Sequence, residues 1–159
     1  MTENERFTAA VTQGHFDDDP AVPLDNDFVN GKGIIRNLVL APIGGAAFIR
    51  SVKGSVRANH YHKTDWHYAF ILSGAVQYFW RPVGSQEKPQ TRVFRSGQMV
   101  FTPPMLEHAF LALDDTTFIT LSRLARTEET HEGDVVRLAK DLTKMVPYIP
   151  QRLLPPELP

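Results

Sequence analysis

One stretch of the chain, residues 54–74, constrains the fold more than any other. It is bounded by glycines and holds three of the six histidines. Side chains alternate between the two faces of an extended strand, so His60 and His62 point the same way and lie within reach of one metal ion. The polar residues that follow have the composition of a turn, and the hairpin they predict would bring His67 back over that pair. The stretch therefore predicts two strands that carry a cluster of histidines.

A second glycine-bounded β segment brings a fourth histidine, His108. Together the two segments resemble the cupin superfamily. The first cupin motif, Gly-x5-His-x-His-x3-4-Glu-x6-Gly, is matched from Gly54 to Gly74, with His67 in place of the glutamate. Every spacing of this motif fits.

The second cupin motif, Gly-x5-Pro-x-Gly-x2-His-x3-Asn, is matched from Gly97 to Ala112. Met105 stands where the family has glycine, and Ala112 replaces the asparagine. Two spaced motifs together are far more specific than either alone. The resemblance covers residues 45–123 and implies an RmlC-like jelly roll.

The resemblance also implies a divalent transition metal, either iron, zinc, nickel or manganese, bound by His60, His62, His67 and His108. Three histidines suffice for a facial site, so His67 is either the fourth ligand or a residue that lines the cavity. An imidazole in place of the family's carboxylate leaves the charge of the ion less compensated, which favours an anionic or enolate-like ligand. Four histidines on a six-coordinate ion would leave two positions for the substrate.

The composition limits the classes of function. The chain has no cysteine, which excludes disulfides, thiolate zinc sites and thiol nucleophiles. A net charge of −1 with unclustered basic residues argues against a nucleic-acid partner. The charged N-terminus lacks the apolar run of a secretory signal, and no apolar run approaches membrane-spanning length. We therefore expect a cytoplasmic protein with a small-molecule substrate and no membrane partner.

The sequence predicts a single all-β domain, a cupin-type double-stranded β-helix or jelly-roll barrel, flanked by two irregular ends. Residues 1–30 show no sustained period and predict an irregular N-terminal arm. Residues 31–138 predict the cupin β-barrel, with early strands over 34–40 and 46–52. Residues 139–159 predict a short helical turn and a proline-rich C-terminal tail, because proline ends a helix.

The region before the tail and the tail itself carry further expectations. The polar run 126–131 predicts an exposed segment, with His131 at the surface. Residues 134–138 predict either a short edge strand or the start of the helical turn. The apolar residues of the tail need cover. We expect that cover from a partner subunit in a homodimer, and a strap along the chain's own barrel is the alternative.

Strand alternation predicts the cavity wall. Phe110 shares a face with His108 and should form an apolar wall beside the metal. Residues 75–81 alternate two sets, so Gln77 and Arg81 contact the substrate if they face inward, and otherwise face out or pack in a second layer. No catalytic base can be assigned, and the nearest candidates by position are Tyr68, Tyr78, Asp65 and Glu107.

A narrower resemblance concerns residues 56–63. They are similar to the Arg-Gly-Asn-His-x-His-Lys segment of cupins from bacterial polysaccharide and nucleotide-sugar pathways, with Ala58 in place of the glycine. In those pathways such barrels isomerise or epimerise keto-sugars, or form the C-terminal half of a capsule-sugar reductase. The resemblance implies a sugar derivative as the substrate.

Three functions follow from these features. The first is a metal-dependent enzyme that acts on a small oxygenated carbon compound as an isomerase or epimerase, with the metal as Lewis acid. The second is a non-haem iron dioxygenase with a carboxylate-free histidine site. The third is a non-catalytic barrel that binds a small ligand, because fold does not fix function. A full ligand set in an aromatic cavity favours an enzyme.

Overall fold

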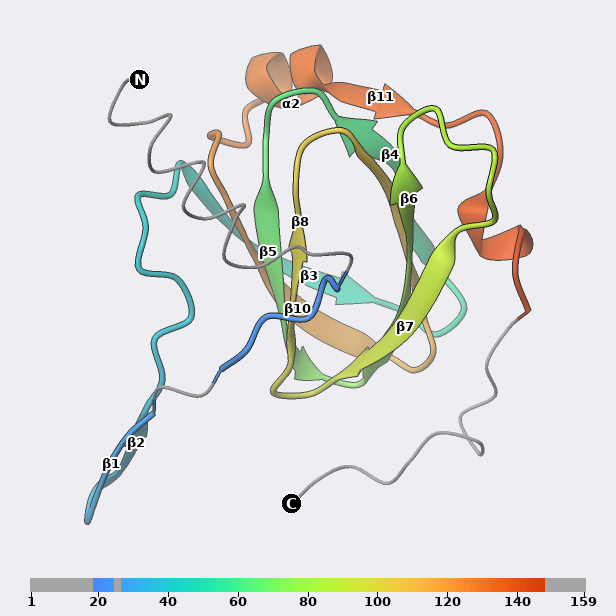
Figure 1. Ribbon diagram of the computed structural model, residues 1–159. Helices are drawn as coiled ribbons and strands as arrows, with labels where there is room; N and C mark the ends of the chain where they lie inside the picture. The colour runs from blue at the N-terminus through green and yellow to red at the C-terminus, as the bar shows by residue number, and fades with distance from the viewer. Residues whose placement is uncertain (1–18, 25–26, 148–159) are drawn as a thin grey trace.

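The computed structural model describes residues 19–24 and 27–147. These residues are mostly β and form two large antiparallel sheets that face each other (Figure 1). The first sheet contains β3 (Gly45–Ser51), β5 (His67–Ser73), β8 (Met99–Thr102) and β10 (Thr116–Ser122). The second contains β4 (Val56–His62), β6 (Ala75–Pro82), β7 (Gln90–Arg95), β9 (Leu106–Ala112) and β11 (Val135–Arg137). The strand orders are β3-β10-β5-β8 and β11-β4-β9-β6-β7. The predicted cupin-type jelly roll is confirmed.

A separate hairpin precedes the two sheets. Strands β1 (Phe28–Asn30) and β2 (Gly33–Ile35) pair only with each other and project from the body of the molecule (Figure 1). The prediction of a strand over 34–40 is therefore wrong beyond Ile35. The residues that follow have no regular structure, and three of them, Leu38, Val39 and Ala41, pack against the outer face of the first sheet. They cover the sheet instead of pairing with it.

The core lies between the two sheets and follows the period of two. On β5, Ala69 and Ile71 face inward with His67, whereas Tyr68 faces out. The inner cluster contains the buried residues Ala69, Ile71, Val76, Tyr78, Trp80, Phe94, Val100, Leu106, Phe110 and Phe118. Alternation thus divides each strand between the inner core and an outer layer.

Both outer faces are covered by chain from the two ends of the domain. The first sheet buries Trp66, Tyr68, Met99 and Phe101 beneath residues that include Val22, Leu24, Leu38 and Val39. The second sheet buries Phe79 and Ala109 against Leu142, with Leu138, Met145 and Val146 around them. Because both faces of each sheet are covered, many outward-facing side chains are buried as well.

In the C-terminal part of the described chain, the structure has one helix that we did not predict and a shorter helical turn than we predicted. A helix, α2 (Glu128–Asp134), occupies the run for which we predicted an exposed segment. The edge strand predicted over 134–138 is β11. The helical turn predicted over 139–145 is a short 3-10 turn, η1 (Leu142–Lys144). The proline-rich tail lies outside the described residues from 148 onward, so the homodimer stays a prediction.

Two residues that stand where the cupin motifs have glycine adopt a left-handed backbone conformation. Met105 has a φ of 59°, and Ala58 has a φ of 65°, both in the left-handed region that glycine occupies freely. Asn59 follows with a φ of 55°, so the chain bulges just before His60, where the register against β9 shifts. Each left-handed alanine or methionine costs about 1 kcal/mol. The chain therefore forms these turns without glycine, at some expense in stability.

None of the helices in the described ranges is long and apolar enough to span a membrane.

Candidate functional site

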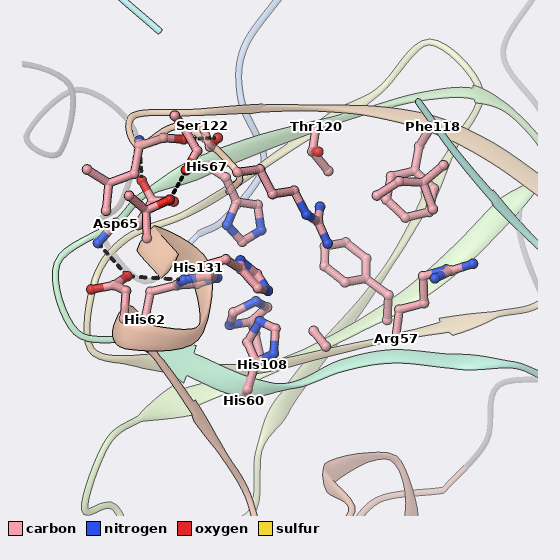
Figure 2. Close-up of a pocket in the computed structure, with 18 of the residues that line it drawn as sticks. Arg57, His60, His62, Asp65, His67, His108, Phe118, Thr120, Ser122 and His131 are labelled. Atoms are coloured by element: carbon pink, nitrogen blue, oxygen red, sulfur yellow. Dashed lines mark hydrogen bonds and ion pairs between the residues drawn. The ribbon is translucent and has the colours of Figure 1, made fainter. Parts of the chain in front are cut away.

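A pocket lies between the two sheets (Figure 2). It is at the end of the molecule where α2 lies (Figure 1). Its volume is about 330 Å³. The rings of His60, His62, His67, His108 and His131 gather in one part of it, as Figure 2 shows. Phe118 and Arg57 lie toward the other end. The pocket therefore has a histidine end and an end with an aromatic wall and a cation.

The histidines meet because two paired strands of one sheet, β4 and β9, and one strand of the facing sheet, β5, present them on their inner faces. His60 on β4 is directly opposite His108 on β9. The ring centroid of His60 lies 4.8 Å from that of His62 and 4.9 Å from that of His108. His67 on β5 approaches from the facing sheet, with centroid distances of 5.3 Å to His62 and 5.2 Å to His108. All four histidines predicted from the sequence thus lie together.

Three of these histidines form a compact ligand group. One nitrogen from each of His60, His62 and His108 lies within 4.8 Å of the other two. His67 is outside this group, although its ring borders it. In this geometry three imidazoles can reach one ion, and His67 lines the cavity beside them.

The ring nitrogens are oriented by hydrogen bonds behind the site. His108 Nδ1 donates to the Leu106 carbonyl oxygen at 2.9 Å, and its Nε2 is buried without a partner among the described residues. His62 Nδ1 lies 3.3 Å from Asp134 Oδ2, to which it donates. A histidine held through Nδ1 by a carbonyl or carboxylate presents Nε2 as a lone pair, the arrangement found behind metal ligands. The donor set therefore fits a transition metal.

The histidines are neutral at pH 7 because they are buried. Burial, together with the nearby His108 and His62, lowers the pKa of His60 to about 2. Burial also lowers the pKa of His67 and of His108 well below their ordinary value. For His62, burial lowers the pKa more strongly than Asp134 raises it. Neutral imidazoles keep the lone pairs that a metal or a proton needs.

These lowered pKa values predict that the metal-free protein loses stability in mild acid. His60 titrates at 6.5 when unfolded and near 2 when folded, so the unfolded state binds the extra proton below pH 6.5. From pH 6.5 to about pH 5, His60 alone should lower the free energy of unfolding by about 2 kcal/mol. Urea unfolding of chelator-treated protein across this range measures the loss. In His60→Asn the loss should be smaller by that amount, and an equal loss in both proteins would contradict the prediction.

Helix α2 adds three pocket residues that the sequence analysis did not predict, Thr130, His131 and Asp134. We predicted His131 at the surface, but it is half-buried and lines the pocket, 5.9 Å from His62 between ring centroids. Asp134, at the end of the helix, is buried against the turn between β4 and β5. The signal in the sequence was Thr127 three residues before Thr130, which together cap the helix, followed by two acidic residues in its first turn.

Asp134 holds helix α2 to the end of β4, the strand that carries His60 and His62. Its carboxylate accepts hydrogen bonds from the Thr64 amide and hydroxyl, each at 2.8 Å, from the Asp65 amide at 3.0 Å, and from His62. Burial opposes ionisation of Asp134, but these hydrogen bonds outweigh it and hold its pKa below the ordinary value. The same carboxylate therefore orients His62 and anchors α2.

The predicted cavity residues divide into two groups. Phe110 lines the pocket beside His108. Gln77 and Arg81 lie on the other face of β6, outside the pocket lining, because Tyr78 takes the inward position between them. Gln77 is buried in the outer layer and donates to Thr91 Oγ1 at 2.9 Å. Arg81 donates to Glu107 at 2.5 Å, so neither residue is placed to contact a substrate in the pocket.

The four candidate bases also differ in whether they border the pocket. Tyr68 and Glu107 face away from the cavity, and burial raises the pKa of Tyr68 to about 12. Tyr78 is in the inner core, where its hydroxyl bonds Thr102 and burial raises its pKa further. Asp65 lines the pocket, and its carboxylate accepts from the Leu124 amide at 2.9 Å. Of the four candidates, Asp65 alone borders the site.

Solved structures share this fold. The RmlC epimerase of Mycobacterium tuberculosis superposes with a TM-score of 0.64 at 17% identity, over 84% of this chain and 76% of that one. The sugar 3,4-ketoisomerase QdtA of Thermoanaerobacterium thermosaccharolyticum, solved with TDP, gives 0.60 at 14% identity, over 75% and 87%. The 3'-monoepimerase ChmJ of Streptomyces bikiniensis, solved with dTDP-quinovose, gives 0.58 at 17% identity, over 72% and 69%.

The sequence itself matches no protein-family model and no curated protein. The structural likeness, at these identities, establishes the fold as the RmlC-like cupin jelly roll. The activity must be argued from the residues of the pocket.

Proposed function

We propose that this protein is a metal-dependent enzyme of the sugar isomerase or epimerase type, which moves a proton on a carbon next to a carbonyl group. The observation that carries the proposal is the set of neutral, oriented histidines around one pocket, with His108 Nε2 buried and without a partner. The fold shared with sugar isomerases and epimerases supports the substrate class. The pocket lies where such a substrate would meet these histidines.

His60, His62 and His108 would hold the metal. The bound metal supplies a Lewis acid that polarises the substrate's carbonyl and stabilises the negative charge of an enediolate. Asp134 and the Leu106 carbonyl fix the two rings of His62 and His108 in the ligand orientation. Phe110 packs beside His108 and stacks on Phe118, which lies toward the other end of the pocket, so the two rings form an apolar wall that limits the access of water.

His131 is the residue that we assign to the proton transfer. It lines the pocket from α2 and does not belong to the three-histidine group. Burial lowers its pKa, as does Arg126, but His131 is only half-buried, whereas the pKa of the fully enclosed His67 falls well below the ordinary value. A lowered pKa keeps the His131 ring neutral at pH 7, and a neutral imidazole can accept a proton, as a general base must. A nitrogen of His131 therefore takes the proton from one carbon and returns it to the same or the adjacent carbon.

Proton exchange tests this proposal. Metal-loaded protein in D2O is incubated with dihydroxyacetone, D-fructose, D-xylulose or TDP-4-keto-6-deoxyglucose, and deuterium at the carbon next to the carbonyl is followed by NMR. We expect exchange with at least one of these compounds. The His131→Gln variant should exchange at least about 100-fold more slowly than the wild type, because a general base contributes at least that factor. Its metal content should be unchanged. The Glu128→Gln variant, altered on the exposed start of the same helix, should match the wild type.

The same experiment separates the other two functions. Oxygen consumption by the iron-loaded protein, without deuterium exchange, would point to a dioxygenase. Binding of these sugars without exchange or oxygen consumption would point to a non-catalytic binding protein. Either outcome would overturn the isomerase or epimerase proposal.

A further inference from the structure

Arg126 lies at the histidine end of the pocket. It belongs to the segment between β10 and α2, and it lines the cavity together with Thr130 and His131. Its positive charge contributes to the lowered pKa values of His62, His67 and His131, so the guanidinium lies close to all three rings. An exposed cation therefore borders the part of the pocket where the substrate would react.

No residue in the described ranges pairs with this cation. Among the described residues Arg126 has no hydrogen-bond or ion-pair partner. The two carboxylates of the pocket are already engaged: Asp134 accepts from Thr64, Asp65 and His62, and Asp65 accepts from Leu124. The guanidinium donors of Arg126 are therefore available to a ligand.

The net charge of the whole pocket also favours an anionic ligand. Its second arginine, Arg57, donates to Ser51 Oγ and to the Arg50 carbonyl oxygen, each at 2.6 Å, and neither acceptor carries a charge. The two guanidinium charges balance those of Asp65 and Asp134, and the five histidines are neutral. The charge of a bound divalent metal is then left uncompensated, which favours an anionic ligand.

We infer that Arg126 binds an anionic group of the substrate, a carboxylate or a phosphate, next to the carbonyl that the histidine end receives. The inference rests on the proposed function and specifies its substrate class. A guanidinium suits this role because its planar fork matches the oxygens of carboxylate and phosphate, and because it stays charged at every physiological pH. The anion would come from an acidic sugar or from a phosphorylated one.

The test compares three keto sugars of one series: D-fructose, D-fructuronate and D-fructose 6-phosphate. Calorimetry measures their affinities for the metal-loaded wild-type protein. We expect at least one of the two anionic sugars to bind about tenfold more tightly than fructose, as a charge-assisted hydrogen bond allows. Preference for fructuronate identifies a carboxylate, and preference for fructose 6-phosphate identifies a phosphate. Equal affinity for all three, or binding of none, would overturn the inference.

Variants assign the preference to Arg126. In Arg126→Gln the anionic sugar should bind no better than fructose, whereas Arg126→Lys should retain part of the preference. Arg92→Gln removes one cation from β7, where Arg92 pairs with Asp19 outside the pocket, and should bind as the wild type does. If Arg126→Gln kept the preference, or lost fructose binding to the same extent, the inference would be wrong.

Binding and turnover can fail separately in this design. An anionic preference that depends on Arg126, without deuterium exchange of any sugar, would support the anion site and overturn the proposed reaction. Exchange that is the same in Arg126→Gln and wild type, with equal affinities for the three sugars, would support the reaction and overturn the anion site.

Discussion

Replacing His62 by alanine should reduce the bound metal from about one ion per chain to less than about 0.1, while the domain stays folded. The variant removes one of the three nitrogens that lie within 4.8 Å of one another, and two imidazoles hold a transition metal much more weakly than three. Folding should survive because His62 is not part of the inner apolar cluster. Elemental analysis of protein purified without an affinity tag gives the metal content, and circular dichroism reports the fold.

His67→Ala is the matched control. Its ring borders the same cavity, but its nitrogen is outside the three-histidine group, so the variant should keep close to one ion per chain. Loss of metal in this variant would make His67 a fourth ligand. Stoichiometric metal in His62→Ala would refute the site as described. A wild-type protein that binds none of iron, zinc, nickel or manganese would leave His62 and Asp134 as a metal-free acid–base pair.

Replacing Asp134 by asparagine should lower the free energy of unfolding by about 3 kcal/mol and weaken metal binding about 10- to 100-fold. The stability loss follows from the four hydrogen bonds that the buried carboxylate accepts, since an amide cannot accept all of them and hydrogen bonds to charged groups are strong. The loss of metal affinity follows from the released His62 ring. Urea unfolding and competitive metal titration measure the two effects.

The charge state of Asp134 adds a condition to this prediction. Its lowered pKa means that its stabilising effect is complete above the unfolded value of 3.8 and is lost as the pH falls from there through the folded value. The difference between wild type and Asp134→Asn should therefore be full at pH 7 and shrink below pH 3.8. As a control, Glu132→Gln, a substitution on the same helix as Asp134, breaks an exposed ion pair with Arg137 of β11 and should change stability by less than about 1 kcal/mol. Equal effects of the two variants would contradict the role of Asp134.

The strands and the four motif histidines could be predicted because both follow short-range rules. The period of two places His60 and His62 on one face, and glycine-bounded segments delimit β4, β5 and β9. Cupin spacing then brought His67 and His108 to the same place. The departures Met105 and Ala58 did not disturb this, because the backbone adopts the left-handed conformation without glycine.

Long-range packing accounts for what the sequence did not predict. The two faces of β6 look alike in sequence because the C-terminal segment buries the outer one, which is why Gln77 remained a cavity candidate. His131 reaches the pocket because Asp134 docks α2 onto the turn after β4, a contact between residues 70 positions apart in sequence. No local pattern reports such a contact, although the helix cap at Thr127 was readable.

The bulge at Ala58 and Asn59 links the pocket to a part of the chain that never enters it. Asn59 holds the C-terminal segment by accepting from the amides of Leu138 and Leu142 and by donating to the Lys140 carbonyl oxygen. Residues 138–142 are therefore hydrogen-bonded to the strand that carries His60 and His62. A ligand that requires this shape of β4 must also stabilise these hydrogen bonds, by thermodynamic linkage. The affinity of the histidines for a ligand therefore depends in part on residues that pack on the opposite side of the sheet.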